Sequence, residues 1–454
     1  MKPVVTVAEM KAIDADAPEP EEVLIERAGA AVASVALRML GRGYGRRVVV
    51  VAGKGNNGAD GRTAAERLRS RGARVAVVEA GELSRLPRAD LVIDAAYGTG
   101  FRGSYEAPDT ADSPVLAVDI PSGIDGDTGT AGDRVVQAYR TVTFAALKPG
   151  LLFGAGADHA GRIEIADIGL DVGRRHIDLV EDSDAGAWLP PRQRGAHKWQ
   201  TAVCVVSGSP GMLGAPRLVS RGALRAGSGY VRLGVPGVDL ASLPAAEAVG
   251  LELPAAGWEA DALAGLDRCR ALVVGPGLGR SESTTAAVRA LVAASPVPTV
   301  VDADGINAIG SVAELARLTR GRRAPTIVTP HDGEFARLAG HPPGDDRIGA
   351  AEQLSRESGA IVLLKGSTTV VAAPDGRTFL AAAGSARLAT AGTGDVLSGI
   401  IGALLAQGVP APEAAALGAH VHGAAARSGF AVGLVAGDLP ELVAAWLSEH
   451  AAHG

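Results

Sequence analysis

Residues 389–405 read Ala-Thr-Ala-Gly-Thr-Gly-Asp-Val-Leu-Ser-Gly-Ile-Ile-Gly-Ala-Leu-Leu, a glycine-rich turn that leads into an apolar run. Apolar side chains recur at three- and four-residue intervals in its second half, which predicts a buried helix. Gly392 and Gly394 leave the first turn without side chains, so we expect the helix to begin near Asp395. The unpaired N–H groups and the positive dipole end at such a start favour a phosphate or a developing anion.

Asp395 lies at the mouth of this predicted helix, and its carboxylate has two interpretations. It can simply cap the helix, which is the commoner role of an isolated Gly-X-Gly-Asp sequence. It can also work as a base beside the backbone amides. The clusters described below favour the second interpretation.

Composition predicts a globular chain with two domains. The 454 residues are 47% hydrophobic and 21% charged, which is enough for two separate cores. A net charge of −6 lacks the basic excess of nucleic-acid or membrane-surface binding, so a small soluble substrate is expected. Cys204 and Cys269 are too few for a disulfide or metal framework and are expected to be reduced thiols.

The first residues lack the apolar core of a signal peptide, and glycines with Asp395 interrupt the apolar run at 389–407. These features predict a cytoplasmic protein without a membrane span. Whether identical chains assemble into a homo-oligomer stays open.

Two series of short apolar segments alternate with helical stretches and predict two α/β/α domains with parallel sheets. After helices at 7–17 and 24–40, the first series covers 47–52, 74–78, 91–95, 115–120, 142–146 and 163–166. The second series covers 201–207, 231–235, 271–275, 299–302, 326–329 and 361–365, followed by two helices. A polar, proline-containing passage between Asp171 and Trp199 separates the domains, which we place at 1–185 and 196–454.

The first strand of the chain leads into Gly53-Lys54-Gly55-Asn56-Asn57-Gly58-Ala59-Asp60-Gly61. Gly-x-Gly-x-x-Gly between a strand and a helix, with Glu79 following at 79 − 58 = 21 residues, is the dinucleotide fingerprint. Taken alone it favours a dehydrogenase. The charge of Asp60 opposes a pyrophosphate at the helix start, however, and the paired asparagines supply oxygen ligands and donors that a phosphate turn does not need.

Polar clusters follow two further strands of the first half. They read Asp-Ala-Ala-Tyr-Gly-Thr-Gly at 94–100 and Val-Asp-Ile-Pro-Ser-Gly at 118–123. All these clusters lie at the carboxyl ends of parallel strands, where ligands bind in open α/β sheets. In this order the motifs resemble the NAD(P)H-hydrate epimerase domain of the YjeF N-terminal type, over roughly the first 170 residues.

That resemblance implies a potassium site at Asn57, Asp94 and Ser122, which offer the hard oxygen ligands that suit it. It implies that the hydrated dinucleotide binds at Asn56, Asn57, Gly58, Ala59, Asp60, Gly98, Thr99, Gly100, Phe101, Arg102, Gly103, Ser104 and Asp119. Asp119 is our candidate for the group that transfers protons. Lys148 is a weaker candidate, because it could equally be a solvated surface lysine. Ala59 stands where the family usually has glycine, which the loop tolerates only if Ala59 keeps a negative φ.

The second half carries further glycine-rich turns where predicted strands end. They lie at 207–215, 275–279, 301–307, 329–334 and 364–369. Any one of them has a purely structural explanation, because such loops join strands to helices in many proteins. Their joint order resembles the ribokinase-like fold and, within it, NAD(P)H-hydrate dehydratase.

This second resemblance makes Asp395 the catalytic aspartate beside an anion hole. It implies that the adenine nucleotide binds at Lys365, Gly366, Ser367, Thr368, Thr369, Gly392, Thr393 and Gly394. It implies that the hydrate binds near Ala215, Gly277 or Gly279, His331 and Asp395. Lys365 offers a cation for a phosphate group, with a surface lysine as the alternative interpretation. His331 can donate a hydrogen bond to the hydrate, with a structural histidine as the alternative. His420 and His422 are expected to be structural.

Together the resemblances imply one enzyme with two repair activities on hydrated NADH and NADPH, an epimerase followed by an ADP-dependent dehydratase that releases AMP and phosphate. Magnesium is expected beside the nucleotide, with Asp302, Asp304 or Glu334 as candidate supports. The preference for ADP over ATP comes only from the resemblance. Three alternatives stay open: an oxidoreductase built on Gly53–Gly58, a small-molecule kinase built on the second half, and a non-enzymatic binding module in the first domain.

Overall fold

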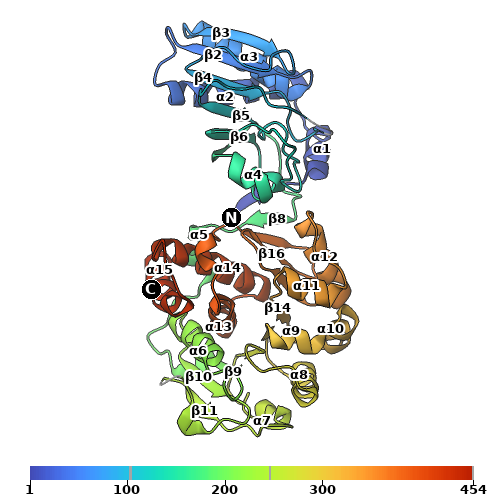
Figure 1. The fold of residues 1–454 in the computed structure, drawn as a ribbon, viewed down its shortest axis with the longest axis vertical. Helices are drawn as coiled ribbons and strands as arrows, with labels where there is room; N and C mark the ends of the chain where they lie inside the picture. Colours follow the sequence, from blue (N-terminus) through green and yellow to red (C-terminus); the bar gives the residue numbers. More distant parts are fainter. Residues whose placement is uncertain (102–104, 245–246, 452–454) are drawn as a thin grey trace. The chain divides into compact units, whose positions relative to one another are not determined.

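The computed structural model describes residues 1–101, 105–244 and 247–451 (Figure 1). Contacts divide the chain into an N-terminal unit, Lys2–Ile177, and a C-terminal unit, Asp178–Gly454 with Met1. Residues 178–185, which the sequence placed in the first domain, therefore group with the C-terminal unit. The reason is visible in their partners, because Val180 N donates to Leu380 O and the Trp188 ring meets Phe379 edge-on at 5.9 Å.

The N-terminal unit contains a six-stranded sheet in the order β3-β2-β4-β5-β6-β7, with every neighbouring pair parallel. The strands are β2 (Arg47–Ala52), β3 (Arg74–Glu79), β4 (Leu91–Ala95), β5 (Val115–Val118), β6 (Arg140–Phe144) and β7 (Arg162–Ala166). The helices are α1 (Val7–Ala15), α2 (Glu21–Leu40), α3 (Asn56–Ser70) and α4 (Gly154–His159). The predicted strands of the first half are all present, within about two residues at their ends.

Strand β2 shows why this sheet is buried on both faces. Val48 and Val50 pack into one core with residues of α2 and α3, whereas Val49 and Val51 pack into a second core on the opposite face. Successive strand side chains point to opposite faces, so an unbroken valine run serves both cores. The carboxyl ends of the strands remain free to carry ligand-binding loops.

In the C-terminal unit a larger sheet follows the order β17-β16-β15-β14-β13-β12-β9-β10-β11. Its strands are β9 (Ala202–Val206), β10 (Tyr230–Gly234), β11 (Val249–Leu251), β12 (Ala271–Val274), β13 (Thr299–Val301), β14 (Thr326–Val328), β15 (Ile361–Leu364), β16 (Thr369–Ala372) and β17 (Thr378–Ala381). The strands from β15 to β11 are parallel, as predicted for all of them except β11, which was not predicted. The antiparallel pair β16 and β17 was not predicted.

The helices of this unit are α5 (Asp182–Trp188), α6 (Gly214–Arg225), α7 (Glu259–Ala264), α8 (Glu282–Ala294), α9 (Asp304–Ile309), α10 (Val312–Thr319), α11 (Asp332–Ala339), α12 (Arg347–Ser358), α13 (Thr393–Ala406), α14 (Ala411–Ser428) and α15 (Leu439–His450). Helix α13 is the helix predicted from residues 389–405, and nearly all of its side chains are buried. It begins at Thr393, two residues earlier than predicted, after Gly392 with φ 89°. The left-handed conformation at Gly392 explains why glycine stands there.

Glycines let α13 approach its neighbours closely. A Cβ added at Gly399 would lie 2.2 Å from Val219 O of α6, and one at Gly402 would lie 2.5 Å from Val273 Cγ2 of β12. The glycines that argued for a buried core helix at this segment are thus positions of close packing. In the part of the chain that is described, no helix is long and apolar enough to cross a bilayer.

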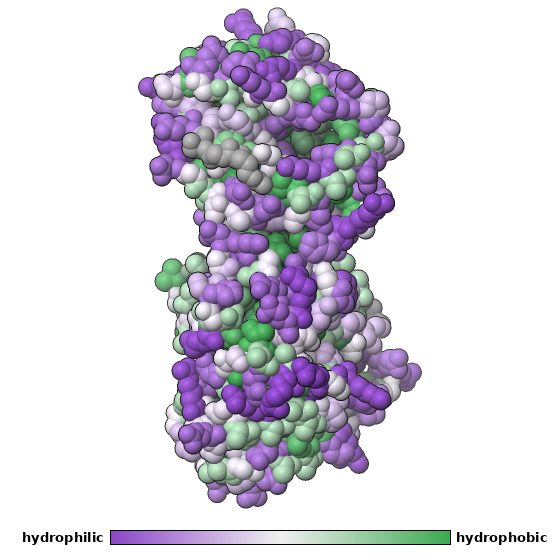
Figure 2. All heavy atoms as spheres, turned by 90° about the vertical axis from the view of Figure 1, so that its right-hand side faces the viewer, coloured by the Kyte–Doolittle hydropathy of each residue, from purple (hydrophilic) through white to green (hydrophobic). Residues whose placement is uncertain are grey.

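Polar side chains cover most of the face shown in Figure 2, and apolar residues lie scattered among them. The large apolar residues that are exposed include Tyr44, Met212, Phe430 and Val432. Scattered exposed apolar residues of this kind are normal for a globular protein.

We expect Gly399→Ala to lower the free energy of unfolding of the C-terminal unit by about 1–3 kcal/mol, because the added methyl group overpacks the contact with α6. Gly214→Ala is the matched control, since no atom lies within 4 Å of a Cβ added at that first residue of α6. Thermal or urea unfolding of both variants measures the difference. Equal stability of the two variants would contradict the packing role of Gly399.

Candidate active sites

Glycines at the end of β2 bring α3 against the neighbouring loop. A Cβ added at Gly58 would lie 1.9 Å from Gly53 O, and one at Gly53 would lie 1.9 Å from Ala96 O. Side chains at either position would therefore separate the turn from the sheet. Ala59 lies inside α3, and the described non-glycine residues with positive φ do not include it. Ala59 therefore keeps the negative φ that the loop requires of an alanine at this position.

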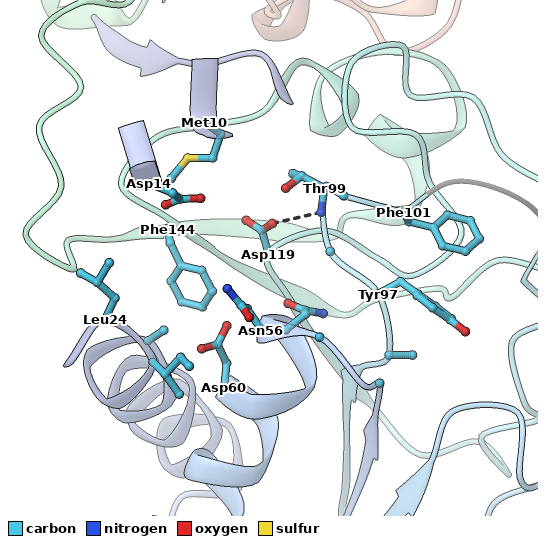
Figure 3. A pocket seen from close by; sticks show the side chains of 18 of the residues that line it. Met10, Asp14, Leu24, Asn56, Asp60, Tyr97, Thr99, Phe101, Asp119 and Phe144 are labelled. Carbon is cyan, nitrogen blue, oxygen red and sulfur yellow. Dashed lines mark hydrogen bonds between the residues drawn. The ribbon is translucent and has the colours of Figure 1, made fainter. Parts of the chain in front are cut away.

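A cavity of about 1000 Å³ opens beside this turn (Figure 3). Of the residues predicted to hold the dinucleotide or move protons, those lining it are Asn56, Asn57, Asp60, Gly98, Thr99, Gly100, Phe101, Asp119 and Lys148. Arg102, Gly103 and Ser104 lie outside the described residues. The volume is in the range of small-molecule binding pockets.

Asp119 and Lys148 form a buried ion pair in this cavity, with Lys148 Nζ 2.7 Å from Asp119 Oδ1. Lys148 is 1% exposed and also donates to Thr143 Oγ1 and Phe144 O, so its interpretation as a surface lysine is wrong. Asp119 accepts further bonds from Thr99 N and Thr143 Oγ1. Burial alone would raise the pKa of Asp119, but Lys148 and these donors hold it below its ordinary value. The carboxylate is thus kept ionised.

The backbone of Asp119 is unusual as well, with φ 68°. Non-glycine residues adopt this left-handed conformation at a cost of about 1–3 kcal/mol, and such residues cluster at functional sites. The strain aims the Asp119 side chain toward the cavity, where Figure 3 shows it meeting Thr99.

Asp60 is 7% exposed and has a different environment. Burial, and then the negative charges of Asp119 and Asp14, raise the pKa of Asp60 to about 8. Asp14 comes from α1 and lines the same cavity, with its own pKa raised by burial. The sequence reasoning missed Asp14, because nothing local in the amino-terminal helix ties it to a loop 40 or more residues further along.

Asp94 and Ser122 meet at the sheet edge, as the predicted potassium site requires. Ser122 Oγ donates to Asp94 Oδ1 at 2.7 Å and Ser122 N donates to Asp94 Oδ2 at 2.8 Å. Asp94 is fully buried with only neutral donors around it among the described residues, so burial raises its pKa to about 6. Asn57 Nδ2 is buried without a partner in the described structure. A buried carboxylate that lacks a cationic partner fits a bound monovalent cation.

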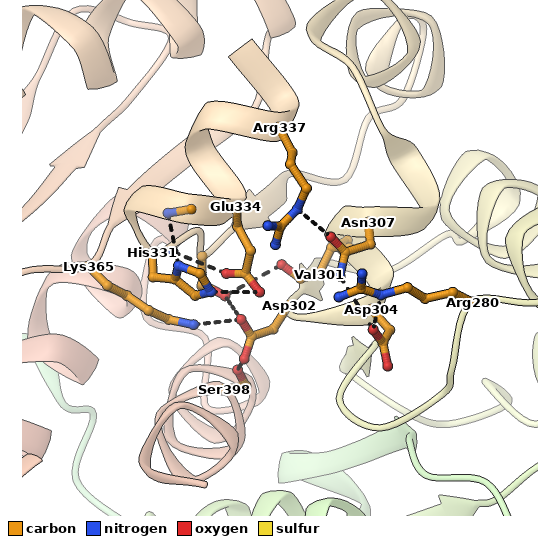
Figure 4. Close-up of polar contacts among 12 residues, drawn as sticks. Arg280, Val301, Asp302, Asp304, Asn307, His331, Glu334, Arg337, Lys365 and Ser398 are labelled. Carbon is orange, nitrogen blue, oxygen red and sulfur yellow. Dashed lines mark hydrogen bonds and ion pairs between the residues drawn. The ribbon is translucent and has the colours of Figure 1, made fainter. Parts of the chain in front are cut away.

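In the C-terminal unit, Asp302 organises the strand ends (Figure 4). Its side chain is fully buried and accepts three hydrogen bonds of 2.7 Å, from Thr329 Oγ1, Lys365 Nζ and Ser398 Oγ. Ser398 belongs to α13, so Asp302 links the end of β13 to that helix. Lys365 is 22% exposed and held by this carboxylate, which makes it part of the site and not a surface lysine.

Asp395 lies in the first turn of α13, half-buried. Burial and the charge of Asp302 raise the pKa of Asp395 to about 7, with Lys365 opposing and Asp304 adding to the shift. A Cβ added at Gly394 would lie 3.3 Å from Lys365 Nζ, so the lysine reaches the glycine-lined start of the helix. A base near neutral pH, a cation and a bare helix N-terminus therefore converge.

The other predicted residues lie at the same edge of the sheet. A Cβ added at Gly277 would lie 3.1 Å from Ala215 Cβ, and Gly279 N donates to Asp304 Oδ2. His331 caps α11, where its Nδ1 accepts from Gly333 N at 3.0 Å. A neutral ring therefore carries its proton on Nε2, which lies 3.5 Å from Glu334 Oε1. The capping and donor interpretations of His331 are compatible.

His422 was predicted to be structural, and it adjoins the helix start. It is buried, hydrogen-bonded to the backbone of Thr393, and its Nε2 has no partner among the described residues. Burial lowers the pKa of His422 to about 4, so the ring is neutral near pH 7. It supports the turn at Gly392–Gly394 without adding charge.

The three candidate supports for magnesium all accept hydrogen bonds within the protein. Asp302 is occupied by its three donors. Asp304 accepts from Gly279 N, Arg280 Nε and Asn307 Nδ2, and Glu334 accepts from His331 N. In the described part of the chain no group of three His, Cys, Asp or Glu side chains could hold a metal alone. This fits Mg²⁺, which usually binds one or two carboxylates together with nucleotide phosphates and water.

Two family profiles match the chain. The one described as NAD(P)H-hydrate dehydratase matches residues 203–447, and the YjeF-related protein N-terminus matches 21–87 and 78–150. The bifunctional NAD(P)H-hydrate repair enzyme of Moorella thermoacetica is 38% identical, covering 96% of this chain and 95% of its own. The chain belongs to the bifunctional NAD(P)H-hydrate repair enzyme family. The namesake proteins of Mycobacterium tuberculosis and Escherichia coli are 42% and 35% identical, over 87% and 84% of this chain and 87% and 80% of their own.

Structural comparison agrees with this family. The ADP/ATP-dependent NAD(P)H-hydrate dehydratase of Bacillus subtilis, co-crystallised with ATP/Mg²⁺, is 29% identical with a TM-score of 0.50. The match covers 60% of this chain and 97% of the Bacillus protein. A ribokinase-like protein of Enterococcus faecalis, 18% identical, matches with a TM-score of 0.52 over 61% of this chain and 97% of its own. Both resemblances stated from the sequence, and the fold class of two α/β domains, are confirmed.

We expect Asp395→Asn to stabilise this repair enzyme at pH 8 by roughly 1–3 kcal/mol. The folded pKa near 7 lies above the ordinary 3.8, so between these values the folded state holds a proton that the unfolded state has lost. Wild-type stability thus falls as the pH rises through that window, whereas the asparagine variant escapes the loss. Urea unfolding at pH 8 and below pH 4 tests this, and a stability difference that is independent of pH would contradict it.

Proposed function

We propose that the C-terminal unit dehydrates the S hydrate of NADH and NADPH at the expense of ADP, and that the N-terminal unit interconverts the R and S hydrates. The observation that carries the dehydratase proposal is the half-buried Asp395, with a pKa raised to about 7, at the N-terminus of α13 beside Lys365. Family membership supports both activities. The assignment of the two activities to residues 1–185 and 196–454 is part of this proposal.

In the dehydratase site, Asp395 removes the proton from the hydrate's hydroxyl group. The oxygen then attacks the β-phosphorus of ADP, AMP leaves, and phosphate is eliminated to restore the dihydropyridine. Backbone N–H groups at residues 392–394 stabilise the charge on the moving phosphoryl group, and Lys365, fixed by Asp302, neutralises phosphate oxygens. Residues 365–369 hold the adenine nucleotide, while Ala215, Gly277, Gly279 and the Nε2 donor of His331 contact the hydrate.

Magnesium would be held by nucleotide phosphates with Asp304 or Glu334 in support, and it supplies charge neutralisation when bound. The co-crystallised Bacillus relative supports this use of nucleotide and Mg²⁺. The choice of ADP over ATP, a cytoplasmic location and a homo-oligomeric assembly remain predictions.

In the epimerase site, the cavity beside residues 56–60 and 98–101 holds the dinucleotide, and Asp119 with Lys148 handles protons at the hydroxyl-bearing ring carbon. Potassium binds at Asn57, Asp94 and Ser122, where it neutralises the buried Asp94 carboxylate. The Arg62–Glu79 ion pair weighs against the dehydrogenase alternative, because Arg62 donates to both Glu79 oxygens, at 2.6 and 2.9 Å, and occupies the acid expected to bind a ribose.

The decisive experiment supplies the R and S hydrates separately with ADP or ATP and follows the dihydropyridine absorbance. We expect fast recovery from S, recovery from R limited by epimer exchange, and release of AMP and phosphate when ADP is used. Asp395→Asn should abolish recovery and retain nucleotide binding in a calorimetric titration. Loss of nucleotide binding would make Asp395 a structural cap, and a stable phosphorylated product would favour the kinase alternative.

Potassium dependence separates the two sites. Exchange of K⁺ for tetramethylammonium should slow epimer exchange and leave dehydration of the S hydrate unchanged, because the proposed cation site belongs to the N-terminal unit. Asp94→Asn should remove the response to K⁺, since the variant has no buried charge for the ion to neutralise. Epimer exchange that is identical in both salts would remove the potassium proposal.

A further inference from the structure

Six carboxyl groups line the cavity of the N-terminal unit, and three of them, Asp119, Asp60 and Asp14, have unequal electrostatic surroundings. The Asp119 carboxylate pairs with Lys148 and accepts hydrogen bonds from Thr143 Oγ1 and Thr99 N. Asp60, on the first turns of α3, is buried, and no hydrogen bond or ion pair of its side chain is described. Figure 3 shows Asp60 and Asp14 on opposite sides of the cavity with Phe144 between them.

Epimerisation at a carbon that bears a hydroxyl group and adjoins the ring nitrogen requires a proton donor as well as an acceptor. Hydroxide is a poor leaving group, so its oxygen must be protonated as the C–O bond breaks. Asp119 is held ionised by Lys148 and can only accept a proton, and Lys148 is itself used by three acceptors. A donor outside this ion pair is therefore needed, and of the two other wall carboxyl groups with raised pKa values Asp60 is buried, whereas Asp14 is exposed.

We propose that Asp60 is the general acid of epimer exchange, an inference that rests on the proposed epimerase function. Its carboxylic acid gives a proton to the hydroxyl oxygen while the C–O bond breaks and the nitrogen lone pair forms a C=N bond, which releases water into the cavity. Water then adds to the other ring face and gives a proton to the Asp119 carboxylate, the electron pair returns to nitrogen, and cavity water carries that proton back to the Asp60 carboxylate. The Asp119 carboxylate stabilises the cationic ring between the two steps.

The surroundings explain why this acid keeps its proton near neutral pH. Burial is the largest cause, the negative charges of Asp119 and Asp14 add to it, and together they raise the pKa of Asp60 to about 8. The other charged groups on the cavity wall are Lys11 of α1, Glu19 and Glu21 at the start of α2, Lys54 and Glu79 at the ends of β2 and β3, and Lys148. Lys148 is already paired with Asp119 and does not stabilise an Asp60 anion.

A neutral Asp60 also resolves a conflict that the sequence presents. A carboxylate at the start of α3 would repel the phosphates of a dinucleotide, whereas a carboxylic acid would not. The same proton that serves the chemistry thus makes the helix start compatible with an anionic ligand.

The test measures epimer exchange without ADP, by converting R hydrate to S in the full-length enzyme, across pH 6 to 9.5. We expect the wild-type rate to fall above about pH 8 as Asp60 ionises, and Asp60→Asn to be about 100-fold slower with that fall removed. Glu66→Gln, an exposed carboxylate change on the same helix, is the matched control and should keep the wild-type profile. A profile for Asp60→Asn that keeps both wild-type rate and shape would overturn the proposal.

Difference infrared spectra of wild type against Asp60→Asn provide a readout that does not depend on activity. They should show a protonated carboxyl band at pH 7 that disappears above about pH 8. A carboxylate band at pH 7 would overturn the proposal even if the enzyme exchanges epimers. If the wild type exchanges no epimers while the protonated band is present, the proposed epimerase function fails and the state of Asp60 stands.

Discussion

A carboxylate that leaves water must either meet positive charge or keep its proton, and this constraint shapes both units of the chain. Asp302 and Asp119 meet lysines, Lys365 and Lys148, at 2.7 Å each. Asp60 and Asp395 have no such ion pair with the residues that the structure describes, and burial with neighbouring carboxylates raises their pKa values to about 8 and 7. Each site thus places a lysine-paired carboxyl group near one whose pKa is raised by burial.

The positions of the two lysines determine which carboxyl group at each site pairs with a lysine. Lys148 and Lys365 both lie just beyond the carboxyl end of a strand, where a buried side chain can still reach the ligand side of the sheet. Each lysine forms an ion pair with a carboxylate that also accepts hydrogen bonds from nearby hydroxyl groups. Thr143 donates to Asp119 in one unit, and Thr329 and Ser398 donate to Asp302 in the other. Asp60 and Asp395 are the carboxyl groups that these lysines do not hold.

Much of this organisation could be predicted from the sequence, because periodicity and strand-end motifs are local properties. The parallel strands, the buried helix after Gly394 and the polar clusters at one sheet edge follow from those patterns. The partners of Lys148 and Lys365 could not be predicted, since Asp302 and Lys365 are 63 residues apart and only the folded sheet brings them together. For the same reason Asp14 was missed and His422 was assigned to no site. Strands β16 and β17 were missed because their sequences lack a marked alternation of polar and apolar residues.

The antiparallel pair β16 and β17 restricts the loop proposed to hold the adenine nucleotide. β15 ends at Leu364 and β16 begins at Thr369, so the segment between them is fastened to the sheet on both sides. Ser367 O is also close to the chain at Gly384, where an added Cβ would lie 2.3 Å away. A tether this short cannot swing as a hinged lid. The loop at 365–368 is thus a short connection between two strands of the sheet.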